Sequence, residues 1–99
     1  MSTAQREEVL EILRRHKPQF AARYELTALG VFGSVARGEA GPGSDVDIVY
    51  VTDAPNLFRA ARMKQELEHL LACSVDIVRL RERMNPRLRQ RILREARYV

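Results

Sequence analysis

The sequence contains one cysteine, two histidines and no long apolar run. Because Cys73 is the only cysteine, an internal disulfide is excluded. No apolar run approaches the roughly 20 residues of a membrane-spanning helix, and residues 1–8 lack the apolar stretch of a signal peptide. His16 and His69 stand alone, without the spacing of metal ligands, and no Ser/His/Asp or Cys/His set emerges. We therefore expect a cytoplasmic protein whose chemistry depends on other side chains.

Length and charge narrow the choice of architecture and partners. The chain has 99 residues, so we expect one domain over residues 1–99. Its net charge of +4 is uneven: residues 1–80 hold 10 Lys/Arg against 11 Asp/Glu, whereas residues 81–99 hold seven Arg against two Glu. This basic segment could meet an acidic protein, nucleic acid or the phosphates of a nucleotide, or simply form a solvated helix face. The basic helix lacks interleaved aromatic residues, so we expect no direct nucleic-acid binding.

Apolar spacing and turn residues predict alternating helices and strands. Strands are expected at residues 28–32, 45–51 and 74–80. Helices are expected at residues 2–16, 34–37 and 57–71 and after the Asn85-Pro86 cap. Pro18 is expected to end the first helix, and Asp53 and Pro55 signal the start of the third, which has Leu57 in its apolar stripe. A full helix between the second and third strands makes them parallel, whereas the link between the first and second is too short for a crossover. The expected fold class is α/β (α+β), a small mixed sheet flanked by helices.

Three aspartates begin or interrupt the predicted strands. Asp45 and Asp47 are two residues apart, so on one strand their side chains point to the same face. Asp76 interrupts the next strand in the same way, and a charge in a buried strand is costly unless it is paired or bound to metal. The three carboxylates predict a Mg²⁺ site, because a hard cation relieves their mutual repulsion. Asp76 could also accept a proton as a general base.

A glycine–serine pair precedes these aspartates. Gly33 permits close backbone approach, and the hydroxyl of Ser34 with nearby N–H groups can hold phosphate oxygens. Arg37 lies one helical turn further on and could reach the same phosphates, or could be a solvent-exposed loop arginine. A phosphate-binding corner beside a metal site favours nucleotidyl transfer, which depends on positioning and charge neutralisation.

Gly33-Ser34, ten further residues, Asp45-Val-Asp47 and then Asp76 resemble the polymerase-β-type nucleotidyltransferase superfamily. Residues 32–39, Phe-Gly-Ser-Val-Ala-Arg-Gly-Glu, and the Arg-rich residues 89–95 are similar to its minimal nucleotidyltransferase (MNT) branch. The resemblance implies that Gly33 and Ser34 hold the triphosphate of ATP. It also implies that all three aspartates carry Mg²⁺.

The MNT resemblance implies a partner as well as an activity. Small MNT proteins are paired with HEPN-domain proteins, and in several pairs the HEPN protein is an RNase toxin. The MNT antitoxin then transfers AMP from ATP to a tyrosine of the toxin, within a hetero-oligomer. Two alternatives remain: an antitoxin that neutralises its partner by binding alone, and a nucleotidyltransferase acting on a small molecule such as an antibiotic. Because no lid or acceptor-binding module is evident, we expect an open site that suits a macromolecular acceptor.

Overall fold

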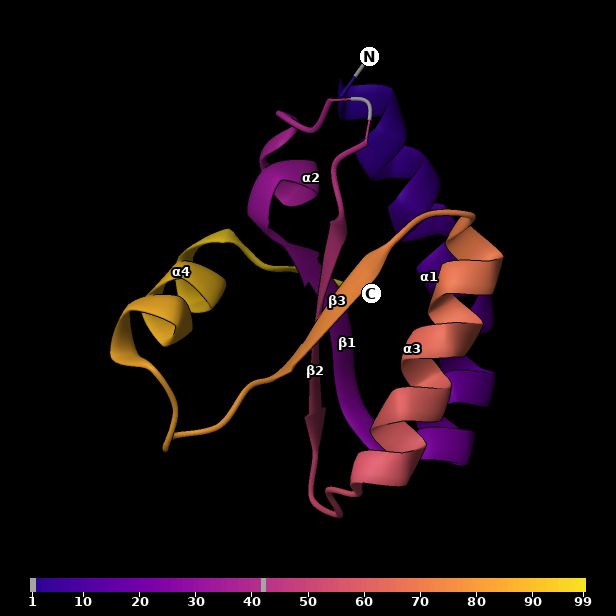
Figure 1. Cartoon of the computed structure of the whole chain (residues 1–99), viewed down its shortest axis with the longest axis vertical. Helices are drawn as coiled ribbons and strands as arrows, with labels where there is room; N and C mark the ends of the chain where they lie inside the picture. Colours follow the sequence, from indigo (N-terminus) through magenta and orange to yellow (C-terminus); the bar gives the residue numbers. More distant parts are fainter. Residues whose placement is uncertain (1, 42) are drawn as a thin grey trace.

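The computed structural model describes residues 2–41 and 43–99. Over these residues, helices and strands alternate along the chain (Figure 1). The elements are α1 (Ser2–Tyr24), β1 (Leu26–Phe32), α2 (Gly33–Arg37), β2 (Val46–Thr52), α3 (Leu57–Leu71), β3 (Val75–Arg79), α4 (Pro86–Glu95) and β4 (Arg97–Tyr98). None of the described helices combines the length and the apolar character that crossing a membrane requires.

The strands form one mixed sheet in the order β3-β2-β1-β4. β2 is parallel to β3 and antiparallel to β1, and β4 pairs antiparallel with the other edge of β1. α3 connects the two parallel strands, as expected for a helical crossover. α1 and α3 pack against one another on one side of the sheet, and α4 lies on the other side (Figure 1). The predicted fold class is therefore confirmed.

Side chains of β2 alternate between two clusters of buried residues. Val46 and Ile48 belong to the larger cluster, which α1 and α3 cover. Val49 belongs to a smaller cluster with Ile92 of α4. Because successive side chains of a strand point to opposite faces, Asp47 shares the α4 face with Val49. The sheet thus buries apolar side chains on both faces and places this carboxylate on the α4 side.

The prediction that the first helix ends at Pro18 is wrong, because α1 continues to Tyr24 with the proline inside it. A proline removes one helical N–H donor and so favours a break. Here Leu13 before the proline and Phe20 and Tyr24 after it are all buried in the larger cluster. The two rings meet edge to face, with centroids 5.4 Å apart. Burial on both sides of the proline stabilises the helix more than the missing hydrogen bond weakens it.

α3 has the predicted bounds, residues 57–71, but its cap and its buried face differ from the prediction. The helix starts neither at Asp53 nor at Pro55 but after Asn56, whose side chain caps it by accepting a hydrogen bond from the N–H three residues later. Leu57 was expected in the apolar stripe, yet as the first helical residue it is 87% exposed. The fully buried side chains of α3 are those of Met63 and Leu67. The stripe that faces the sheet therefore begins about one turn later than the sequence spacing suggests.

Strand boundaries shift by one or two residues from those predicted, and β4 was not predicted at all. β1 begins at Leu26, and β2 begins at Val46, so Asp45 lies just outside the strand. β4 is only two residues long and pairs with Gly30 and its neighbour. A Cβ at Gly30 would lie 2.5 Å from the carbonyl oxygen of Arg97, so only glycine allows β4 to approach this closely.

Candidate active site

Asp47 and Asp76 lie opposite one another on neighbouring strands. They are direct register partners in the parallel pair of β2 and β3. Directly opposite residues point to the same face of a sheet, so both carboxylates lie on the α4 face. Asp47 is half-buried, and Asp76, on the edge strand, is exposed. The structure therefore brings together two of the three aspartates that the sequence singled out.

Gly33 lies in contact with the Asp47 side chain. Phe32 pairs with Asp47 across the sheet, so Gly33, the first residue of α2, follows at once. The backbone of Gly33 has φ +74°, and a Cβ there would lie 2.2 Å from Oδ2 of Asp47. Glycine is thus required twice, by a left-handed backbone conformation and by a carboxylate that fills the space of a side chain. Ser34 follows, half-buried, on the same short helix.

Arg37 binds two carboxylates in this structure. Its Nε donates to Oε1 of Glu39 at 2.9 Å, and its Nη1 donates to Oε1 of Glu95 at 3.0 Å. The same Glu95 oxygen accepts a hydrogen bond from the N–H of Gly33 at 3.3 Å. Arg37 therefore pairs with Glu39 in the loop and with Glu95, the last residue of α4. Through Glu95, α4 contacts Gly33 and thus the glycine–serine corner formed by Gly33 and Ser34.

Glu95 is a site residue that the sequence reasoning missed. Its side chain is only 16% exposed, and Nη2 of Arg91, one turn earlier on α4, lies 4.0 Å away. The one signal in the sequence was the presence of an acid among the seven arginines of residues 81–99. Nothing in that pattern indicates that α4 folds back over α2.

Electrostatics at the aspartate pair favour a cation. Burial raises the pKa of Asp47 above its ordinary value, and the negative charges of Asp76 and Asp45 raise it further. The positive charges of Arg91 and Arg37 act in the opposite direction and only partly compensate. A divalent cation would bind these oxygen ligands and relieve the repulsion, so the donor set fits Mg²⁺.

Asp45 lies two residues before Asp47, and its charge contributes to the raised pKa of Asp47. It is exposed, precedes β2, and lines a hollow of about 730 Å³ together with Ser44 and Cys73. In residues 2–41 and 43–99, no three His, Cys, Asp or Glu side chains form a group that could hold a metal ion in this conformation. Its assignment as a ligand with Asp47 and Asp76 is therefore still a prediction.

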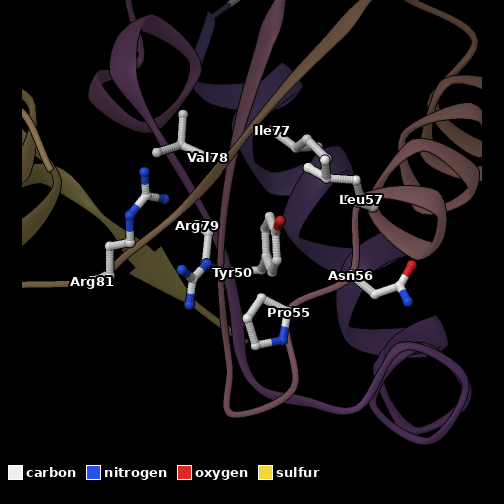
Figure 2. Close-up of a pocket in the computed structure, with 9 residues that line it drawn as sticks. Tyr50, Pro55, Asn56, Leu57, Ile77, Val78, Arg79 and Arg81 are labelled. Atoms are coloured by element: carbon white, nitrogen blue, oxygen red, sulfur yellow. The ribbon is translucent and has the colours of Figure 1, made fainter. Parts of the chain in front are cut away.

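A second hollow lies along β3, on the side of the strand that meets the beginning of α3. It has a volume of about 600 Å³, and the ring of Tyr50 stands between Ile77 and Leu57 on one side and Arg79 and Arg81 on the other (Figure 2). None of the predicted catalytic or phosphate-binding residues lines it. The hollow combines exposed apolar side chains with two guanidinium groups and is distinct from the aspartate pair.

Comparisons with known proteins agree with this geometry. Residues 7–99 match the family model described as nucleotidyltransferase domain. The chain is 38% identical over 94 residues to the protein adenylyltransferase MntA of Thermococcus cleftensis, an alignment that covers 94% of each protein. A solved structure described as a candidate minimal nucleotidyltransferase shares 43% identity and a TM-score of 0.70, covering 89% of this chain and 93% of that chain.

The fold also recurs in a toxin–antitoxin complex. A chain in the structure of a tri-AMPylated Shewanella oneidensis HEPN toxin with its MNT antitoxin has a TM-score of 0.60 at 21% identity. That match covers 99% of this chain and 71% of the other. The family match, the related adenylyltransferase and the glycine–aspartate contact agree, and the chain therefore belongs to the nucleotidyltransferase domain family, in its minimal nucleotidyltransferase branch, and is a nucleotidyltransferase enzyme.

Proposed function

We propose that this enzyme is an antitoxin that transfers AMP from ATP to a tyrosine hydroxyl of a partner HEPN-type toxin, with Mg²⁺ as its cofactor. The observation that carries the proposal is the Asp47–Asp76 register pair, with the backbone of Gly33 in contact with Asp47. The names of the relatives support the reaction class: one is a protein adenylyltransferase, and one structure with this fold contains an AMPylated HEPN toxin.

The residues divide into a metal-binding set and a triphosphate-binding set. Asp47 and Asp76 would hold Mg²⁺, with Asp45 as the third ligand once its exposed side chain turns toward them. When bound, the ion would neutralise phosphate charge and polarise the phosphorus centre. Gly33, Ser34 and Arg37 would hold the oxygens of the triphosphate. The family resemblance supports this role for Gly33 and Ser34, and the position of Arg37 one helical turn further on supports it for Arg37.

The reaction needs one proton acceptor and one leaving group. The tyrosine oxygen attacks the α-phosphorus of ATP, a new O–P bond forms, and the bond from that phosphorus to the bridging oxygen of pyrophosphate breaks. Asp76 takes the phenolic proton, a role that its exposed position on the edge strand permits. A site at an exposed sheet edge also suits a protein acceptor that presents its own hydroxyl, within a hetero-oligomer of enzyme and toxin.

Intact mass spectrometry of the toxin tests this proposal. After incubation with ATP and Mg²⁺, the wild-type enzyme should add one or more adenylyl groups to the toxin, and Tyr→Phe at the acceptor should prevent the gain. Asp47→Asn and Asp76→Asn should each lower the rate by about 100-fold or more, because removing preorganised transition-state charge is costly. Asp53→Asn, an exposed aspartate after β2, is the matched control and should keep full activity.

Neutralisation by binding alone is the second candidate, favoured by a separate observation. Leu57, which is 87% exposed, lines the hollow together with Arg79 and Arg81 (Figure 2), and Phe58, the next residue of α3, is 88% exposed. An exposed apolar pair beside positive charge is typical of a protein-binding surface. Under this alternative, the Asp47→Asn enzyme protects against the toxin as well as the wild type at equal concentration. Loss of protection in that variant supports catalysis.

A further inference from the structure

Glu95 occupies the position where the proposed function requires an anion of the nucleotide. Its Oε1 accepts hydrogen bonds from the N–H of Gly33 at 3.3 Å and from Nη1 of Arg37 at 3.0 Å. These are two of the groups assigned to the triphosphate. The carboxylate is 16% exposed, so it lies within the site rather than at its rim.

A carboxylate oxygen and a phosphate oxygen can each accept hydrogen bonds from these two donors. Both are negatively charged acceptors, and a guanidinium binds either with similar geometry. One N–H hydrogen cannot bond fully to both, and two anions placed together on it repel one another. Nucleotide and Glu95 therefore exclude each other at Gly33.

We propose that Glu95 is an affinity-determining residue of the triphosphate site. It is an internal anion that holds the site in the absence of nucleotide, is displaced when ATP binds, and returns to help expel pyrophosphate after transfer. The proposal rests on the proposed function, because it concerns the same triphosphate site.

The contacts around Glu95 make this exchange inexpensive. Arg91 lies one helical turn earlier with its Nη2 4.0 Å from the carboxylate, so it offers a partner to the displaced side chain. Arg37 keeps its hydrogen bond to Glu39 after Glu95 leaves, so its guanidinium remains oriented. Arg37 therefore keeps Glu39 as a counter-charge, and the displaced Glu95 keeps Arg91, during the exchange.

Glu39 provides a matched control for a binding experiment. Glu39 and Glu95 each give one negative charge to Arg37, but the hydrogen bond from Gly33 goes to Glu95. Calorimetric titration with MgATP and with inorganic tripolyphosphate should compare wild type, Glu95→Gln and Glu39→Gln in the absence of toxin. Glu95→Gln should bind both probes about tenfold more tightly, which corresponds to about 1.4 kcal/mol. Glu39→Gln should differ from the wild type by less than twofold, because the glutamine oxygen still accepts the hydrogen bond from Arg37 and the lost charge stood on a side chain that is 65% exposed.

A second variant separates contact from charge. Glu95→Asp keeps the negative charge but is one methylene shorter, so it should no longer reach the N–H of Gly33, and its affinity should lie between those of the wild type and Glu95→Gln. Thermal unfolding of each variant establishes that the fold is intact.

Each outcome of the titration has a defined meaning. If Glu95→Gln binds MgATP no more tightly than the wild type, or more weakly, Glu95 orients Arg37 instead and the proposal is overturned. Equal tightening by Glu39→Gln would also overturn it, because the effect would then be general charge removal. If toxin adenylylation fails while the predicted binding order holds, the proposed function falls and this inference stands. If no variant binds either probe, both are contradicted.

Discussion

Replacement of Gly33 by alanine perturbs the site at its most constrained point. The residue has φ +74°, where a Cβ collides with backbone, and the added Cβ would lie 2.2 Å from Oδ2 of Asp47. The Asp47 carboxylate must therefore rotate away or the backbone must move. Either change separates the glycine–serine corner from the aspartate pair.

The expected cost has two parts. A left-handed conformation costs a residue with a Cβ about 1–2 kcal/mol, and moving the Asp47 side chain off its preferred rotamer adds about 0.5–1.5 kcal/mol. Gly33→Ala should therefore destabilise the protein by about 1.5–3.5 kcal/mol. For a domain of this size, each kcal/mol lowers the melting temperature by about 4–8 °C. The variant should melt roughly 6–28 °C below the wild type and lose most adenylyl transfer.

Gly43 supplies the control that separates these two parts. It has φ +80°, but a Cβ there meets nothing within 4 Å. Gly43→Ala should therefore show only the backbone cost of about 1–2 kcal/mol. Differential scanning calorimetry measures both variants. If Gly33→Ala is no less stable than Gly43→Ala and still modifies the toxin, the contact between Gly33 and Asp47 does not organise the site.

Other perturbations test separate parts of the structure. Pro18→Ala should stabilise the protein by about 1–3 kcal/mol, measured by urea unfolding, because it restores a hydrogen bond inside α1; no gain would contradict a continuous helix. Because burial and the charge of Asp76 raise the pKa of Asp47, its stabilising contribution is complete below the ordinary value of 3.8 and is lost as pH rises through the raised pKa. Without metal, the wild type should therefore lose stability with rising pH relative to Asp47→Asn, and a constant difference between the two would refute this. Burial also raises the pKa of the Cys73 thiol, so iodoacetamide should alkylate it more slowly than free cysteine at neutral pH.

Much of the site was predictable because its parts are local in sequence or follow from one topological rule. A helix between two apolar strands requires a parallel crossover, and that pairing places Asp47 beside Asp76. The glycine–serine corner follows directly from the end of β1. The pairing of Asp47 with Asp76 and the position of the glycine–serine corner depend on residues close together in the sequence or on the crossover rule, so the sequence pattern predicts them.

Features that depend on distant contacts were not predictable. Pro18 indicates a helix end, and only the burial of Phe20 and Tyr24 against the rest of the chain overrides it. Glu95 reaches the site because α4 packs on the sheet face opposite α1 and α3, a placement that local spacing does not specify. Asp45 was expected within a strand, yet β2 begins one residue later and leaves its side chain exposed.

In the proposed function, Asp47 and Asp76 share a divalent cation beside the triphosphate site. Electron paramagnetic resonance with Mn²⁺ as the probe measures this directly, with and without a non-hydrolysable ATP analogue. The wild type and Asp53→Asn should bind Mn²⁺, more tightly when the analogue is present, whereas Asp47→Asn and Asp76→Asn should lose most of that binding. Unchanged Mn²⁺ affinity in both site variants would contradict the account.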